Sequence, residues 1–419
     1  PIDAPRGMIK DREGRPLAVS VPVRAVWADP KTVLAKGGVG FDQRWQALAN
    51  ALHLSLATLS TRINANPQGR FIYLARQVDP AQAKWIDKLN LPGINLRDES
   101  RRFYPAGHVA ANLIGFTNID GQGIEGVEKS FNAQLTGKPG VRQVREDRYG
   151  RVVENLTEVA PAPAHNIQLS IDERLQTITE DALDNAVAWN KAESGASVLI
   201  NIPTGEILAM ASYPDFNPNN REGATINDFR NRAISDTFEP GSTVKPFLGL
   251  AGLDSGLRRP EDKILSRGMF YLPGVSRGWG DANRGGHGWT DLRKSISQSV
   301  NTYYYQLGTD MGVERYDQYM GGRYGFGQPS GIDLAGENPG ILPNPAWKLK
   351  NRKERWFPGD TVNMSIGQGD WKVTPLQLVR AHGGIADNGG TQVTNVHLFC
   401  NTACVITDCL YLILGQISG

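Results

Sequence analysis

The stretch Glu239-Pro-Gly-Ser-Thr-Val-Lys-Pro246 carries the most specific chemistry of this 419-residue chain. Ser242 and Lys245 are three residues apart, so a helix that starts here places both side chains on one face. Pro246 fits a helix only within its first turn, which puts Ser242 close to the helix N-terminus. A serine hydroxyl is a weak nucleophile, and a lysine that is desolvated near a helix N-terminus can serve as its base. The alternative interpretation is an N-cap serine followed by a surface lysine.

A second motif, Ser299-Val300-Asn301, follows later in the chain. A second serine can relay a proton to a leaving group, and an asparagine amide can hold a substrate carbonyl. S-x-x-K and S-D-N, in this order, are two of three motifs of one class of serine acyl-transfer sites, whose third motif is Lys-Thr-Gly. In this chain Val300 stands in place of the Asp of the second motif. No Lys-Thr-Gly or Lys-Ser-Gly follows residue 301. Ser242, Lys245 and Ser299 are therefore the catalytic candidates, and Asn301 is the substrate-binding candidate.

The composition excludes several classes of protein. Hydrophobic residues make up 40% of the chain and charged residues 21%, which is typical of a globular protein rather than of a disordered, collagenous or polytopic membrane protein. The 45 Lys and Arg residues nearly balance the 43 Asp and Glu residues, and a net charge of +2 gives no sign of a nucleic-acid partner. At about 150 residues per domain, the length predicts two or three domains.

The cysteines mark an unusual end of the chain. Cys400, Cys404 and Cys409 are the only three, an odd number that does not make a disulfide framework. Their spacing, with only His397 nearby, matches a zinc site poorly, and no H-E-x-x-H motif occurs, so we expect no metal. Charge almost vanishes after Gly390. Residues 391–419 are therefore predicted to be an atypical tail outside the preceding domain.

The Pro/Ala-rich stretch 160–164 is the predicted boundary between two domains, which we place at residues 1–160 and 161–390. In the first, Val19 to Trp27 is predicted as a strand, 41–64 as helical and 141–153 as a hairpin. In the second, the runs 197–202 and 207–212 are predicted to pair as a hairpin. Asp172 can cap a long helix whose apolar face comprises Leu175, Ile178, Ala182, Leu183 and Val187.

Two glycine-containing patterns suggest other chemistry. Gly274-Val-Ser-Arg-Gly278 matches the nucleophile elbow of another hydrolase class, but the glycine-rich sequence after it cannot form the helix that an elbow requires. Gly121, Gly123 and Gly126 match a dinucleotide-binding fingerprint, but no parallel β-α-β continuation is evident around them. We regard both as weaker than the Ser242 motif.

At Glu239 to Pro246 the sequence closely resembles the active-site segment of class B penicillin-binding proteins. Further stretches resemble the same family in the same order and cover residues 1 to about 390; they are 6–14, 101–105, 123–128, 169–176, 203–210, 367–369 and 374–377. Residues 1 to about 240 look most like the cell-division members of the family. Residues after about 246 look more like the elongation members, through the stretches 286–288 and 331–337.

The resemblance implies an α+β fold, in which a β-rich elongated N-terminal pedestal domain of the dimerisation type precedes a serine β-lactamase-like, penicillin-binding transpeptidase domain. It implies D,D-transpeptidation of D-Ala-D-Ala stem peptides during cell wall synthesis in division. Ser242 would be the acylated nucleophile and Lys245 its base, Ser299 would relay the proton, and Asn301 would bind the substrate amide. No cofactor is implied.

The implied partners are peptidoglycan stem peptides, β-lactams, and glycosyltransferase and other divisome or elongasome membrane proteins, with no nucleic acid. The implied location is the periplasmic face of the bacterial inner membrane, through an N-terminal anchor that the printed chain does not include. The missing third motif implies a C-terminally truncated transpeptidase domain. Three hypotheses remain: a transpeptidase, an inactive truncated form or non-catalytic scaffold that acts through residues 1–160, and a β-lactam-sensing or hydrolysing relative.

Overall fold

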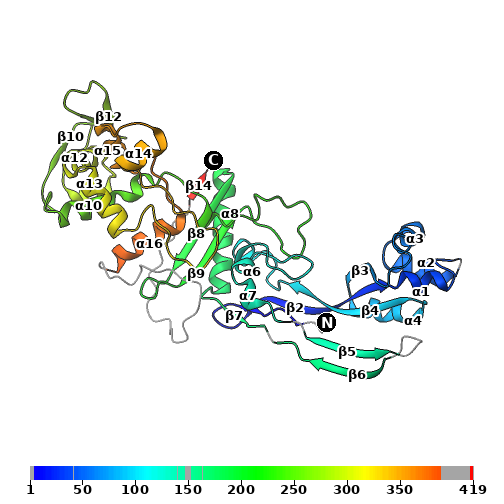
Figure 1. Ribbon diagram of the computed structural model, residues 1–419. Coiled ribbons are helices and arrows are strands. Elements are labelled where there is room, and N and C mark those ends of the chain that lie inside the picture. Colours follow the sequence, from blue (N-terminus) through cyan, green and yellow to red (C-terminus); the bar gives the residue numbers. More distant parts are fainter. Residues whose placement is uncertain are drawn as a thin grey trace. The chain divides into compact units, whose positions relative to one another are not determined.

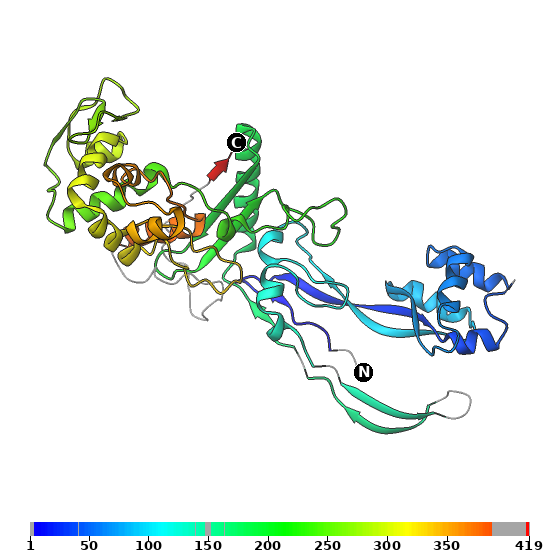
Figure 2. The same cartoon turned by 45° about the horizontal axis from the view of Figure 1, so that its top comes forward.

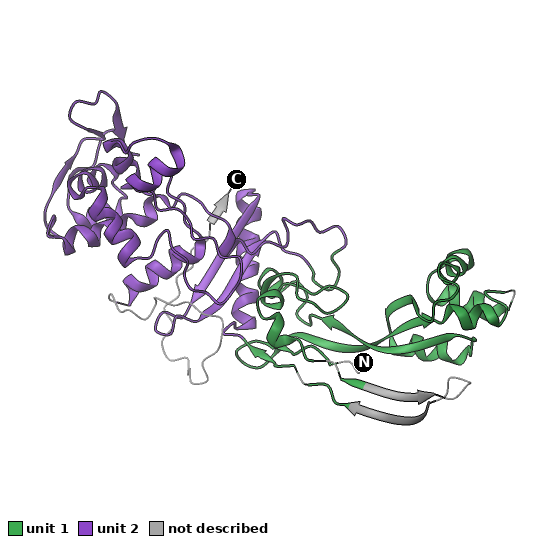
Figure 3. Ribbon diagram, in the orientation of Figure 1, with its two compact units in different colours: residues 1–168, 217–221 green, residues 169–216, 222–419 purple. Residues whose placement is uncertain are grey.

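The computed structural model describes residues 4–40, 42–138, 140–146, 152–162, 164–387 and 416–418. The chain divides into two compact units (Figure 3). Unit 1 comprises residues 1–168 and 217–221, and unit 2 comprises residues 169–216 and 222–419. Both units mix helices and strands, which confirms the predicted α+β class. Of the predicted tail 391–419, only 416–418 are described, so its three cysteines lie outside the described residues.

Unit 1 is built on a sheet around one long strand, β2 (Pro16–Ala28). The strand order is β3-β2-β1-β7, and β4 also pairs with β2, antiparallel from Val19 opposite Phe103 to Ala28 opposite Ile94. The other bounds are β1 (Ile9–Lys10), β3 (Ile72–Val78), β4 (Ile94–Phe103) and β7 (Ile167–Gln168). The strand predicted from Val19 to Trp27 lies within β2. The hairpin predicted over 141–153 is formed by β5 (Val141–Glu146) and β6 (Val152–Val159).

Four helices of unit 1 gather at one end of β2 in both views (Figures 1 and 2). They are α1 (Pro30–Ala35), α2 (Gln43–Ala51), α3 (Leu56–Asn64) and α4 (Pro80–Lys88). Their core includes Trp45, Leu48 and Ile63. The helical pattern predicted over 41–64 forms two helices, because Ser55 Oγ accepts a hydrogen bond from Thr58 N and starts a new helix.

A buried ion cluster joins three stretches of unit 1 that are far apart in sequence. Glu128 is fully buried in α6 (Gly126–Ser130), near α5 (Ala111–Ile114) and α7 (Asn132–Leu135). Its two carboxylate oxygens accept from Arg6 Nε at 2.6 Å and from Arg102 Nε at 2.5 Å. Gly123 packs so closely that a Cβ there would lie 1.8 Å from the Glu128 carbonyl oxygen. Close packing therefore accounts for this glycine of the dinucleotide-like pattern.

Unit 2 begins with α8 (Glu173–Asn190), which packs on β8 (Ser194–Ile200) and β9 (Ile207–Tyr213) (Figure 1). Asp172 caps α8 by accepting from Arg174 N and Leu175 N, and β8 and β9 pair as an antiparallel hairpin, both as predicted. β14 (Gln416–Ser418) pairs with the other edge of β8.

The predicted buried face of α8 was wrong at Ile178, which is 63% exposed, and at Ala182, which is also exposed. The helix instead buries Gln176, which donates from Nε2 to Met210 O and accepts at Oε1 from Met210 N. Met210 lies in β9, the edge strand of this sheet. The helix therefore docks by satisfying the edge of the sheet, a polar contact that apolar periodicity does not reveal.

The rest of unit 2 is mainly helical and surrounds a core that includes Phe247, Tyr303, Tyr304 and Trp371. Two short antiparallel strand pairs accompany it: β10 (Ile264–Ser266) pairs with β13 (Gly288–Thr290), and between them in sequence β11 (Met269–Tyr271) and β12 (Gly278–Gly280) form a hairpin. No helix follows Gly278 before residue 291, as expected for a chance match to the nucleophile elbow. The helical elements are α9 (Arg232–Ser235), η1 (Gly241–Val244), α10 (Lys245–Asp254), α11 (Leu292–Ser297), α12 (Asn301–Met311), α13 (Val313–Asp317), η2 (Gln318–Arg323), α14 (Pro345–Arg352), α15 (Pro358–Met364) and α16 (Pro375–Ala386).

A search of the described residues finds no helix whose length and apolar character would let it cross a membrane.

Candidate active site

The Ser242 segment forms the helix start that its sequence predicts. Residues 241–244 make the single 3-10 turn η1, and α10 continues from Lys245 with Pro246 in its first turn. Gly241, at φ +58°, donates its N–H to Gly367 O at 2.9 Å. Gly367 is equally constrained, because a Cβ there would lie 2.2 Å from Gly241 O. This close backbone approach fixes the turn that presents Ser242, which is exposed.

Lys245 is buried and connects the two sequence motifs. Only 2% of its surface is exposed. Its Nζ donates to Ser299 O at 2.7 Å, to Ser299 Oγ at 3.0 Å and to Asn301 Oδ1 at 2.6 Å. The surface-lysine alternative is therefore wrong. Among the described residues, no hydrogen bond joins the Ser242 side chain to Lys245, so the structure brings Lys245, Ser299 and Asn301 together and places Ser242 one helical turn before Lys245.

Burial changes the protonation of this lysine. Desolvation lowers the pKa of Lys245 from 10.5 to about 8, and the negative charge of Asp281 opposes this shift. The centroid of the Tyr304 ring lies 5.6 Å from Nζ. An appreciable fraction of the amine is therefore neutral close to neutral pH, as a general base requires.

The three contacts of Lys245 indicate how a proton could move. An ammonium has three N–H donors, which match the three oxygen acceptors. A neutral amine has two donors and one lone pair, so one contact must reverse its direction. Of the three partners only the Ser299 hydroxyl can donate. When Lys245 loses a proton, its Nζ therefore accepts a hydrogen bond that the Ser299 hydroxyl donates.

The Ser299-Val300-Asn301 motif is a strained turn between α11 and α12. Ser299 has φ +52°, a left-handed conformation that non-glycine residues rarely adopt. The turn is tied back by Ser299 N to Ile296 O at 3.1 Å and by Val300 N to Ser295 O at 2.9 Å. Val300 is buried, whereas Ser299 is exposed. Such backbone strain gathers at functional sites when the surroundings enforce it.

The sequence reasoning missed Asp281, a fully buried carboxylate beside this turn. Its Oδ2 accepts from Thr302 N at 3.0 Å and from Thr302 Oγ1 at 3.2 Å, and its Oδ1 contacts His287 Nε2 at 3.3 Å. The available signal was one acidic residue in a glycine-rich segment, which alone does not reveal burial.

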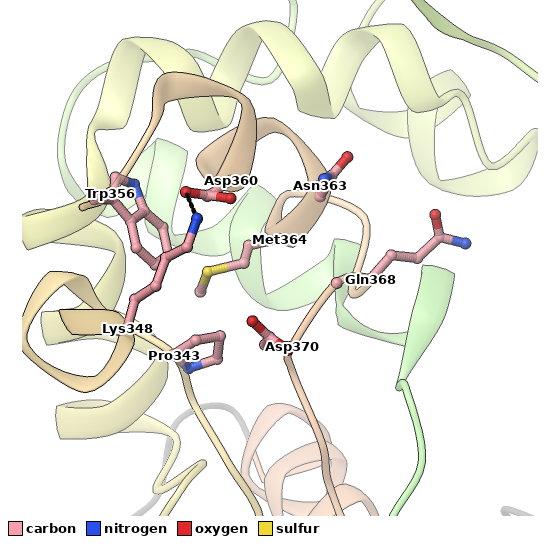
Figure 4. Close-up of a pocket in the computed structure, with 9 residues that line it drawn as sticks. Pro343, Lys348, Trp356, Asp360, Asn363, Met364, Gln368 and Asp370 are labelled. Atoms are coloured by element: carbon pink, nitrogen blue, oxygen red, sulfur yellow. Dashed lines mark hydrogen bonds and ion pairs between the residues drawn. The ribbon is translucent and has the colours of Figure 1, made fainter. Parts of the chain in front are cut away.

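A pocket of about 160 Å³ lies elsewhere in unit 2 (Figure 4). Figure 4 shows Lys348 reaching Asp360, an ion pair of 2.7 Å, with Trp356 and Met364 beside them. The pocket also includes Gln368, the neighbour of Gly367. None of the four predicted site residues lines it. Within the described part of the chain, no three His, Cys, Asp or Glu side chains form a group that could hold a metal ion.

Two protein-family models match the chain. The penicillin-binding protein dimerisation domain matches residues 1–169, and the penicillin-binding protein transpeptidase domain matches residues 195–399. The chain is 48% identical over 398 residues to the peptidoglycan D,D-transpeptidase FtsI of Escherichia coli, which covers 93% of this chain. It is 30% identical over 442 residues to the peptidoglycan D,D-transpeptidase MrdA of the same organism, covering 96% of this chain and 67% of that relative.

The chain spans 63% of the length of the FtsI relative. Among solved structures, a complex between a penicillin-binding protein and MreC from Helicobacter pylori matches with a TM-score of 0.78 and 26% identity, over 96% of this chain and 79% of that chain. The same kind of protein from Helicobacter pylori without MreC matches with a TM-score of 0.75 and 25% identity, over 98% and 81%. The predicted arrangement, a pedestal domain followed by a transpeptidase domain, is confirmed.

Proposed function

This chain belongs to the class B penicillin-binding proteins, and on that premise we propose that it cross-links peptidoglycan by serine D,D-transpeptidation. In this proposal Ser242 Oγ attacks the carbonyl of the penultimate D-Ala of a stem peptide, while Lys245 takes the hydroxyl proton. The peptide C–N bond breaks, and the departing D-Ala amine receives a proton through Ser299. An acceptor amine then attacks the ester and releases Ser242. Asn301 binds the substrate amide, and penicillin acylates the same serine.

One observation carries the assignment. Lys245 Nζ lies within 3.0 Å of Ser299 Oγ and 2.6 Å of Asn301 Oδ1, so a buried base contacts both polar residues of the second motif. A surface lysine after an N-cap serine would have no reason to be desolvated against these groups. The lowered pKa of about 8 suits the same role.

The test is intact-mass spectrometry of the full chain after incubation with benzylpenicillin. We expect a gain of one penicillin mass, mapped to the peptide that contains Ser242, and no gain in Ser242→Ala. Ser255→Ala, at the other end of α10, is the matched control and should keep the adduct. An adduct that persists in Ser242→Ala would overturn the assignment.

A second candidate is a non-catalytic scaffold in a wall-synthesis complex that acts through residues 1–160, which fall within compact unit 1. A folded, soluble chain that gains no penicillin mass would support the scaffold. Circular dichroism and gel filtration of the same sample distinguish this result from a chain that has aggregated.

The finer assignments are also proposals. We propose a pedestal at 1–160, a transpeptidase domain at 161–390 and a separate tail at 391–419. The partners would be stem peptides, β-lactams, a glycosyltransferase and other divisome or elongasome proteins, at the periplasmic face of the inner membrane through an N-terminal anchor. The division into cell-division and elongation types near residue 246 stays a prediction. The sequence identities to FtsI and to MrdA are each averaged over nearly the whole chain and do not compare its two parts. Affinity purification of the full chain from bacterial membranes, with the recovered proteins identified, tests the partners.

A further inference from the structure

One carboxylate and one imidazole bracket the Ser299-Val300-Asn301 turn. Thr302 directly follows the turn in sequence, and its N–H donates to Asp281 Oδ2 at 3.0 Å. Gln298 directly precedes the turn, and its Oε1 lies 3.0 Å from His287 Nδ1. Asp281 Oδ1 and His287 Nε2, 3.3 Å apart, join the two sides. The residues immediately before and after the turn are thus held by one connected pair.

The N-terminus of α12 needs this carboxylate. The first N–H groups of a helix have no partner within the helix, and the N-cap residue usually supplies one. The N-cap of α12 is Val300, whose side chain makes no capping bond. Asp281, from the end of β12, supplies the missing acceptor, and its negative charge suits a helix N-terminus.

The pair is itself fixed by the surrounding strands. Asp281 N donates to Gly268 O at 2.8 Å. Ser266 Oγ, at the end of β10, accepts from His287 N at 3.2 Å and lies 2.7 Å from Thr302 Oγ1. The Asp281 side chain is fully buried, and that of His287 is 13% exposed. These anchors hold the pair beside Ser299, whose left-handed backbone needs surroundings that enforce it.

We propose that Asp281 and His287 are positioning residues that clamp the Ser299–Asn301 turn from both sides and thereby hold Ser299 Oγ and Asn301 Oδ1 against Lys245 Nζ. The hydrogen-bond geometry carries the clamp, and only its catalytic consequence rests on the proposed function. Asp281 acts in two ways: its oxygens cap α12, and its charge acts on the Lys245 amine. His287 connects Asp281 to Gln298 through the contact of its Nδ1 with Gln298 Oε1.

Charge supports the same assignment. Asp281 raises the pKa of Lys245 against the larger opposing effect of desolvation. Because a carboxylate can only accept, His287 Nε2 supplies the hydrogen of its contact with Asp281 Oδ1. The titratable and charged groups around the cluster are Asp281, His287, Arg284, Lys294, Tyr304 and Tyr305.

The first test measures Lys245 directly and does not need acylation. Trace acetylation of the full chain between pH 6 and 11, quantified by mass spectrometry of the Lys245 peptide, gives the midpoint at which the amine becomes reactive. Asp281→Asn keeps the shape and an acceptor oxygen but removes the charge, so we expect the midpoint to fall by about one pH unit. Asp291→Asn removes the carboxylate that caps α11 and is the matched control, with an unchanged midpoint. Superimposable curves for Asp281→Asn and the unmodified chain would overturn the charge role.

The second test measures the turn. Hydrogen exchange of the peptide that spans 298–303 should quicken about fivefold in His287→Ala, the factor expected for about 1 kcal/mol of lost hydrogen bonding. His287→Gln retains an N–H donor and should restore part of the protection, which a merely space-filling histidine would not show. Unchanged exchange in His287→Ala overturns the clamp, and so does equal exchange in both variants. If Asp281→Asn does not fold, the His287 variants still decide the proposal.

Failure of the proposed function gives a different pattern. A chain that gains no penicillin mass can still show the Asp281-dependent midpoint and the His287-dependent exchange. That result would support the positioning of the turn by Asp281 and His287 and would contradict a catalytic role for the turn. Penicillin labelling that proceeds at an equal rate in His287→Ala, despite quickened exchange, would remove only the catalytic consequence of the clamp.

Discussion

The lowered pKa of Lys245 makes the pH dependence of Ser242 acylation the sharpest prediction for this site. The reactive form of the base is the neutral amine, so the labelling rate should rise with pH and level off above the pKa of about 8. A lysine at its ordinary pKa would give a rate that still rises at pH 10.

The size of the effect follows from the pKa. At pH 7 about one-tenth of the amines are neutral when the pKa is about 8, whereas only about one in 3000 is neutral at a pKa of 10.5. Burial therefore increases the amount of available base about 300-fold at pH 7. Between pH 6 and pH 8 the neutral fraction rises about 50-fold, and this is the expected rise in the single-turnover labelling rate.

The assay follows the gain of one penicillin mass over time, in buffers from pH 6 to pH 10, with circular dichroism recorded at each pH. Lys245→Arg keeps a cation and its donors but cannot lose a proton, so labelling should be lost. Lys263→Arg, a change at an exposed lysine, should leave the profile unaltered. A labelling rate that is flat from pH 6 to pH 8, or one that falls, would refute the role of Lys245 as the base.

Three further predictions concern stability and packing. Glu128→Gln should lower the free energy of unfolding by about 3 kcal/mol in urea titrations, because two buried arginines lose their shared counter-charge. Gly367→Ala should slow penicillin labelling and reduce stability by about 1–3 kcal/mol, since its new Cβ would meet Gly241 O, whereas Gly384→Ala has open space and should do neither. Relative to Lys245→Met, the unmodified chain should gain unfolding free energy between pH 8 and 10.5, because the unfolded lysine binds more protons there than the folded one; equal slopes in urea titrations at several pH values would contradict this.

Short-range chemistry explains which parts of the structure the sequence could predict. Asp172 caps α8, and Pro246 occupies the first turn of α10, because both signals depend only on neighbouring residues. Helix and strand periodicity likewise located β2 and the hairpin of β8 and β9. Periodicity failed at Ile178, since α8 docks partly through a polar contact between Gln176 and Met210 of β9, in addition to its apolar contacts.

In the active site, too, the sequence could predict only some of the residues. The order of the motifs predicted that Lys245, Ser299 and Asn301 lie together, but it did not predict Asp281. Asp281 reaches α12 only because β11 pairs with β12 and places its end beside the turn. Its role depends on tertiary geometry, and a single acidic residue among glycines carries no local signal of that geometry.

In each unit, one buried charged side chain contacts residues from stretches that are far apart in the sequence. In unit 1, three stretches that resemble one family meet at Glu128, where a single carboxylate pairs with both Arg6 and Arg102. In unit 2, two motifs meet at Lys245, a buried cation whose contacts are two carbonyl oxygens and one hydroxyl. The first cluster pairs its charges within hydrogen-bond distance, which favours a fixed structure. The second leaves its cation with only uncharged groups in direct contact, which favours loss of a proton, and that difference separates a structural ion cluster from a site that can act as a base.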